Sequence, residues 1–116
     1  MIRDELVTYE VAKLAKEKGF DGCSFYVYNN EKILLGVKGV VNWHKVEFVA
    51  PTQSLLQRWL REEKGLHITV PFDGNGFWWE IKNLENGVYE FGEALGFDTY
   101  ELALEDALKY TLENLV

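Results

Sequence analysis

The chain has 116 residues, of which 47% are apolar and 27% charged, as is typical of one folded globular domain. Aromatic residues make up 15% of the chain, which argues against disorder. Cys23 is the single cysteine, so no intramolecular disulfide can form and a reducing compartment is favoured. Residues 1–20 contain no apolar stretch of the kind that a secretory signal needs. We therefore expect one cytoplasmic domain over residues 1–116, without a membrane span.

The net charge of −7 is distributed unevenly along the chain. Residues 1–65 carry ten Lys or Arg against nine Asp or Glu, a net charge of +1. Residues 66–116 carry two against ten, a net charge of −8. A phosphate backbone is bound by basic residues that displace its counterions, so direct binding of nucleic acid is not expected. The acidic half is either a solubilising surface or a surface that meets a basic partner or imitates DNA.

Three helices are predicted from apolar spacing and from capping signals. The first covers residues 8–18, with Thr8 as its N-cap and Gly19 as its stop. The second covers residues 53–64 and lies between a capping Thr52 and a terminating Gly65. The third covers residues 100–115, where Asp98 and Glu101 fit a capping box.

Strands are predicted where apolar and polar residues alternate or where β-branched residues lie between turn signals. They cover residues 23–28, 33–38, a short 46–49, 66–72, 77–82 and 88–91. Gly36 and Gly39 indicate a bulge in the second of these strands, and 73–76 (Asp-Gly-Asn-Gly) is a hairpin turn. The order α-β-β-(β)-α-β-β-β-α predicts an α+β fold. We expect a mainly antiparallel sheet of five to six strands with three amphipathic helices packed on one face.

The run APTQSLLQRWLRE at residues 50–62 resembles a segment of small uncharacterised proteins found in gut-bacterial genomes, phages and mobile elements. The opening helix and the Thr99-Tyr100-Glu101 start of the last helix are also similar to those proteins. Together these stretches cover about a third of the chain. The resemblance implies a bacterial or phage setting, but it carries no assigned activity and therefore no site residue.

Residues suited to catalysis or metal binding are few. Cys23 could act as a nucleophile only beside a base such as His67, but the alternation places Cys23 with Phe25 and Val27 on an apolar face. Two distant histidines, His44 and His67, and one cysteine do not form a zinc site. No phosphate-binding glycine loop opens a helix. We therefore expect no catalytic residue, no metal and no cofactor.

One aromatic group does not fit a purely structural interpretation. Trp78 and Trp79 are consecutive in a predicted strand, so they point to opposite faces. Trp79 belongs with the apolar Phe77 and Ile81, which leaves Trp78 beside Glu80 on the other face. The candidate binding face consists of Trp78, Glu80, His67, Tyr26, Tyr28 and Tyr89. These aromatics either form hot spots for a partner or stabilise an exposed sheet by cross-strand packing.

Three functions remain open from the sequence. The first is a non-catalytic interaction or accessory domain that binds a protein, or a second copy of itself, through the aromatic face. The second is an acidic inhibitor that binds a basic partner through residues 66–116. The third is an enzyme with an unrecognised site, which a deep pocket holding His67 and Glu80 would favour and a flat sheet face would disfavour.

Overall fold

The structure is a computed structural model that describes residues 4–42, 44, 48–91 and 96–116. Its three helices are α1 (Tyr9–Glu17), α2 (Gln53–Lys64) and α3 (Tyr100–Asn114). Its strands are β1 (Cys23–Tyr28), β2 (Leu34–Asn42), β3 (Leu66–Thr69), β4 (Glu80–Asn83) and β5 (Tyr89–Phe91). The α+β class and the three predicted helices are confirmed.

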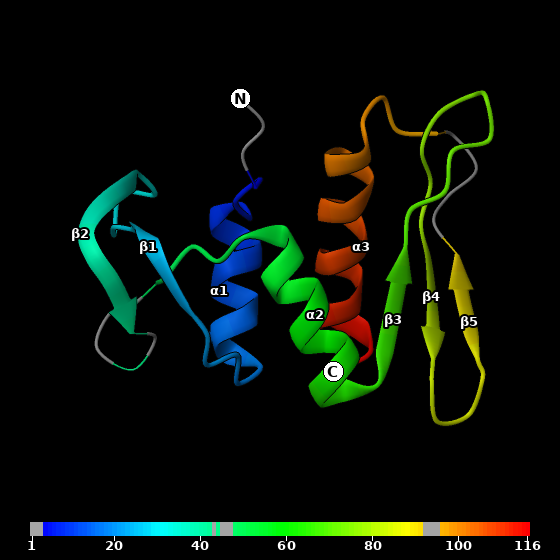
Figure 1. The fold of residues 1–116 in the computed structure, drawn as a ribbon, viewed down its shortest axis with the longest axis horizontal. Coiled ribbons are helices and arrows are strands. Elements are labelled where there is room, and N and C mark those ends of the chain that lie inside the picture. The colour runs from blue at the N-terminus through cyan, green and yellow to red at the C-terminus, as the bar shows by residue number, and fades with distance from the viewer. Residues whose placement is uncertain (1–3, 43, 45–47, 92–95) are drawn as a thin grey trace.

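The strands form two separate antiparallel sheets, so the expectation of one sheet with five to six strands is wrong. One sheet is the β1–β2 ribbon, residues 23–42, and the other has the order β3-β4-β5. The helices form a layer between the two sheets, which lie at opposite ends of the long axis of about 40 Å (Figure 1). Helices α2 and α3 pack on the three-stranded sheet, and α1 packs on α3. The helices therefore do not all cover one face of one sheet.

A third strand beside the ribbon was expected at residues 46–49. Residues 45–47 lie outside the described part of the chain. Val49 forms a single antiparallel bridge with Val27, supported by Tyr28 N–H donating to Phe48 O at 2.8 Å. This short contact joins the ribbon to the rest of the molecule, and no described strand links the ribbon to β3.

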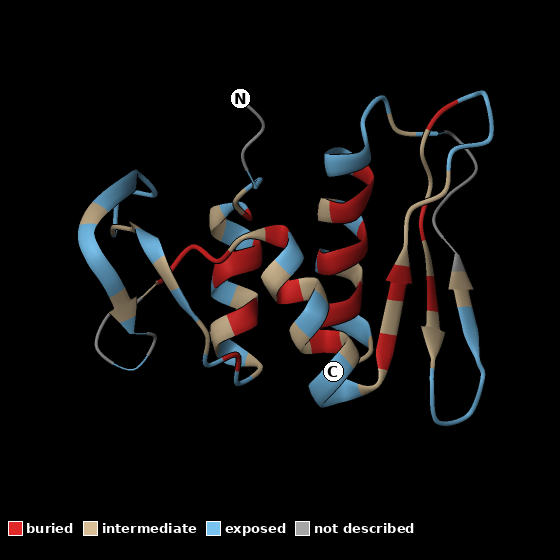
Figure 2. Ribbon diagram, viewed as in Figure 1, coloured by how far each residue is buried: buried red, intermediate tan, exposed pale blue. Residues whose placement is uncertain are grey.

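The buried residues concentrate where the helices meet each other and the three-stranded sheet (Figure 2). Leu56 and Leu60 of α2 meet Leu104, Leu108 and the inner face of β3 and β4 in one core. The ribbon contributes only half-buried residues to this core, among them Val27 and Tyr28. The apolar free energy of folding therefore comes mainly from the helices and from β3 and β4.

The helix ends are set by local hydrogen bonds. Thr8 Oγ1 and Thr52 Oγ1 accept from the third backbone N–H of α1 and α2, as predicted. At the end of α1, Phe20 N–H donates to Ala15 O at 3.0 Å and the N–H of the left-handed Gly19 donates to Lys16 O at 3.1 Å. These two bonds satisfy two final carbonyls in the manner of a Schellman motif. Helix α3 differs from prediction, because its cap is Thr99 rather than Asp98.

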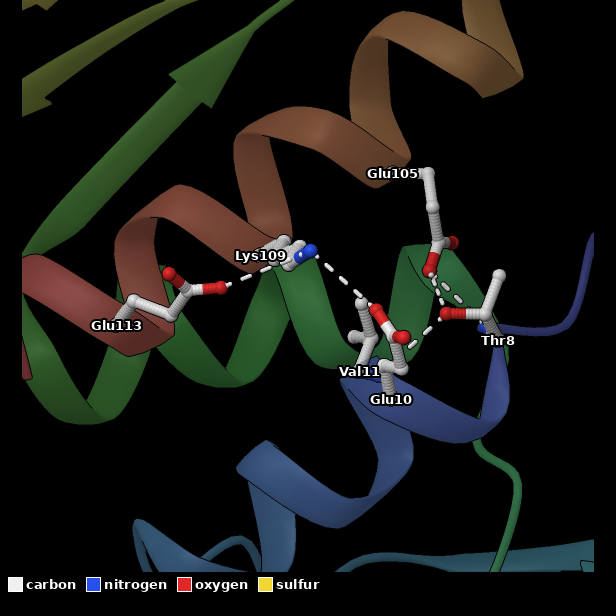
Figure 3. A network of polar contacts seen from close by, with 6 residues as sticks. All are labelled: Thr8, Glu10, Val11, Glu105, Lys109 and Glu113. Atoms are coloured by element: carbon white, nitrogen blue, oxygen red, sulfur yellow. Dashed lines mark hydrogen bonds and ion pairs between the residues drawn. The ribbon is translucent and has the colours of Figure 1, made fainter. Parts of the chain in front are cut away.

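A polar cluster, consisting of Thr8, Gln53 and Glu105, joins the start of α1 to the other two helices (Figure 3 shows Thr8 and Glu105). Glu105 Oε2 accepts from Thr8 N–H at 3.0 Å and from Thr8 Oγ1 at 2.8 Å. Glu105 Oε1 accepts from the buried Gln53 Nε2 at 2.9 Å. This carboxylate therefore connects three helices through both of its oxygens.

Candidate functional site

The open face of the three-stranded sheet contains three of the predicted site residues. The register pairs His67 with Lys82 and Lys82 with Tyr89, and in the next row it pairs Thr69 with Glu80. Directly paired residues share a face, so His67, Glu80 and Tyr89 lie together on the side that the helices leave open. Thr69 Oγ1 donates to Glu80 Oε1 at 2.8 Å, and Lys82 Nζ lies 5.1 Å from the centre of the Tyr89 ring.

The two adjacent tryptophans have different surroundings, in keeping with opposite directions. Trp79 is 3% exposed, and its Nε1–H donates to Asp106 Oδ2 at 2.8 Å. Trp78 is half-buried just before β4, and its backbone N–H donates to Pro71 O at 3.1 Å. The core role predicted for Trp79 and Ile81 is confirmed. Trp78 is less exposed than a residue of an open strand face would be.

Tyr26 and Tyr28 do not belong to this face, because they lie in the ribbon at the other end of the molecule. Tyr28 OH donates to Val7 O at 2.7 Å, and the Tyr28 ring meets Tyr9 edge to face at 5.7 Å. Burial, with the charges of Glu105 and Glu5, raises the pKa of Tyr28 above its ordinary value. The six predicted site residues thus divide between two distant surfaces.

The raised pKa of Tyr28 predicts a loss of stability in alkali. Tyr28 stabilises the fold in its neutral form, so its contribution is complete below the ordinary pKa of 10.0 and is lost as the pH rises through the folded value. Tyr28→Phe should therefore lose less unfolding free energy than the wild type between about pH 9 and 11. Urea titrations of both proteins at each pH measure this. The pKa values of Tyr110 and Lys109 are raised as well, but both groups are present in the wild type and in the variant. Unfolding free energies that fall in parallel with pH in the two proteins would contradict the prediction.

The β1–β2 ribbon exposes many of its apolar side chains, among them Phe25, which was expected on an apolar face with Cys23 and Val27. Phe25 is 54% exposed and Val40 is 61% exposed. Cys23 is also exposed, so its predicted burial beside Phe25 is wrong. The ribbon has six large apolar side chains that are exposed to solvent: Phe25, Tyr26, Ile33, Leu34, Leu35 and Val40.

A bulge in β2 explains why the alternation of apolar and polar residues did not predict burial in the β1–β2 ribbon. Tyr26 pairs with Gly36, yet Ser24 pairs with Val41, so residues 37–40 loop out of β2. Gly39 takes the left-handed backbone conformation that this loop requires, with φ of 86°. The bulge that Gly36 and Gly39 indicated is therefore confirmed. It resets which side chains face inward, so the period of two no longer predicts burial on either side of it.

A groove of about 1040 Å³ opens between the ribbon and the segment at residues 4–8. Ala50 N–H donates to Tyr26 O at 2.9 Å, so the segment still pairs with β1 at this point. Beyond it the chain pairs with the N-terminal segment: Pro51 O accepts from Val7 N–H at 3.0 Å, and Gln53 N–H donates to Glu5 O at 2.8 Å. Phe25, Leu34, Val40 and Leu55 line the resulting space, with Asp4 and Glu5 as its charged residues.

Sequence reasoning missed this groove although one signal was present. Residues 23–42 contain only three charged residues, Glu31, Lys32 and Lys38. Within the two strands themselves Lys38 is the only charge. A strand pair with so little charge is expected to be covered on both faces. In the described structure the helices cover neither the groove nor β2.

No catalytic constellation assembles among the described residues. Cys23 and His67, the one nucleophile and base pair considered above, lie in different sheets at opposite ends of the long axis. None of the cavities described is lined by His67 or Glu80. The described residues also contain no group of three or more His, Cys, Asp or Glu placed to hold a metal ion.

Comparisons with protein-family models, with curated proteins and with solved structures return no match for this chain. Among the helices of the described residues, none has the length and apolarity needed to cross a membrane.

Proposed function

We propose that this protein is a non-catalytic protein-interaction domain whose principal binding surface is the β1–β2 ribbon with its groove. The observation that carries the proposal is the exposure of Phe25, Leu34 and Val40 around one groove, on a strand pair whose only charge is Lys38. Contiguous exposed apolar surface beside a polar rim is characteristic of protein-binding sites. The resemblance noted in the sequence supports a bacterial or phage setting for this function.

Backbone groups support the same conclusion. Strand β2 has β1 as its partner among the described strands, so its outer edge presents N–H and C=O groups to solvent. The first half of β1 also borders the groove after the chain departs at Pro51. Such edges bind further strands, in which main-chain hydrogen bonds provide affinity and side-chain pockets provide specificity.

The open face of the three-stranded sheet is a second candidate surface for the same function. It combines His67, Glu80 and Tyr89, as proposed from the sequence. However, Glu80 accepts a hydrogen bond from Thr69, and Lys82 Nζ lies over the ring of Tyr89. These internal contacts support the structural interpretation, in which cross-strand pairs stabilise a solvated face. The groove therefore ranks above the aromatic sheet face.

An acidic inhibitor of a basic partner is the alternative function. Helix α3 exposes Glu101, Asp106 and Glu113, while its one basic residue, Lys109, is paired with Glu10 at 3.3 Å and with Glu113. Residues 66–116 therefore present a surplus of negative charge. Binding through this surface would weaken steeply with salt, whereas binding through the apolar groove would persist.

Site-specific photo-crosslinking in bacterial cells tests the proposal. A photoreactive phenylalanine analogue at Val40 should form discrete cross-links to protein, because Val40 borders the groove. The same analogue at Val88, which is 55% exposed but lies in the β4–β5 turn, is the matched control and should give none. Equal cross-linking from both positions, or none from Val40, would contradict a binding role for the ribbon.

A further inference from the structure

The occupant of the groove can be inferred from how charge and apolar surface are distributed; the inference rests on the proposed function. The ribbon carries Glu31, Lys32 and Lys38, a net charge of +1, while residues 66–116 carry −8. The ribbon and the three-stranded sheet stand at opposite ends of an axis of about 40 Å (Figure 1). A contact between two ribbons thus places the three-stranded sheets, which belong to the acidic half, at the far ends of the two molecules.

The charges around the groove complement the ribbon's own charge. Asp4 and Glu5 are the charged residues in the lining of the groove, and both are exposed. Lys38 lies in the exposed bulge at residues 37–40 of β2, beside Val40. In a two-fold arrangement each surface meets its own copy, so the bulge of one molecule can approach the acidic rim of the other twice. The apolar residues around the rim then bury each other.

We propose that the β1–β2 ribbon binds a second copy of this chain, forming a closed two-fold dimer. Phe25, Leu34 and Val40 of each copy are covered by the same residues of the other. The bulge prevents long regular pairing at the β2 edge, and a short, interrupted edge limits continued strand addition. The contact therefore ends at two copies and does not extend into a fibre.

Sedimentation velocity of the purified full chain, over about a hundredfold range of micromolar concentrations, tests this proposal. The wild type should shift from the mass of one chain toward twice that mass. Val40→Lys should weaken association by about tenfold or more, because each dimer buries two added ammonium groups. Val88→Lys makes the same exchange at a similarly exposed site and should change association by less than about twofold.

Three results of the sedimentation experiment would overturn the dimer. The wild type could stay monomeric at every concentration, the two variants could weaken association equally, or association could grow beyond two copies without end. Association that disappears at about 0.5 M salt would also overturn it, because an apolar contact between acidic proteins should persist or strengthen there. Thermal melting of both variants shows that they fold. A monomeric wild type whose Val40 cross-links to a different protein would reject self-association and retain the interaction function.

Discussion

Replacing Trp79 with threonine should lower the free energy of unfolding by about 3–5 kcal/mol, as truncation of a large buried aromatic does. The side chain is 3% exposed, and its ring lies 5.1 Å from the centre of the Tyr110 ring. Its Nε1–H bond to Asp106 ties the segment just before β4 to α3. The substitution removes the packing and the hydrogen bond together. Urea titration followed by circular dichroism gives the value.

Two further variants separate the contributions at this position. Trp79→Phe keeps most of the aromatic packing and removes the bond to the exposed Asp106, so it should cost about 1–2 kcal/mol. Trp78→Thr should cost less than half of what Trp79→Thr costs, because Trp78 is half-buried. Equal costs for the two tryptophans would mean that both faces of this strand are packed, contrary to the open sheet face described above.

Glu105→Gln is the second substitution with a large expected effect, about 1.5–3 kcal/mol of unfolding free energy. The carboxylate accepts from Thr8 with one oxygen and from Gln53 with the other. A glutamine amide has one oxygen and one NH₂ group. Whichever way it lies, its NH₂ faces either the two Thr8 donors or the buried Gln53 Nε2. The side-chain contact of Glu105 with either Thr8 or Gln53 is therefore lost, although Gln53 Nε2 keeps its bond to Glu101 O at 2.9 Å.

Lys109→Ala is the matched control for this substitution, one turn further along the same helix (Figure 3). Its ion pairs with Glu10 and Glu113 are exposed, at 3.3 and 3.9 Å. Exposed ion pairs are screened and contribute little, so the unfolding free energy should match the wild type within error. A Glu105→Gln variant as stable as Lys109→Ala would show that the three-helix connection has no role in stability.

The helices were predictable because their signals are local. Thr8, Thr52 and the glycines at 19 and 65 act on backbone groups within one turn, so the bounds of α1 and α2 agree with prediction to within one residue. The cap of α3 was misassigned by one residue. Asp98 and Thr99 both have side chains that suit an N-cap. Thr99 is the cap because its backbone is extended and its hydroxyl accepts from Leu102 N–H at 3.1 Å.

The division into two sheets was not predictable, because strand pairing depends on contacts distant in sequence. Each hairpin was identified from its turn, but no local feature says whether two hairpins share a sheet. His67, Glu80 and Tyr89 came together because they belong to successive antiparallel strands. Tyr26 and Tyr28 were assigned to the same face only because one sheet was assumed. The groove depends on residues 51–53 pairing with residues 5–7 rather than continuing along β1, and that pairing is also distant in sequence.

The packing of α1 against α3 also determines when the core between the helices can form during synthesis. These helices come from opposite ends of the described chain, and Lys18 Nζ donates to Val116 O at 3.0 Å. Their contact spans nearly the whole sequence, and contacts of such separation form slowly because a long loop must be ordered first. Until α3 leaves the ribosome, α1 lacks the helix on which it packs, and α2 has only the three-stranded sheet. A nascent chain would therefore complete this core only once α3 has emerged, and chaperones would meet the uncovered α1 together with the ribbon.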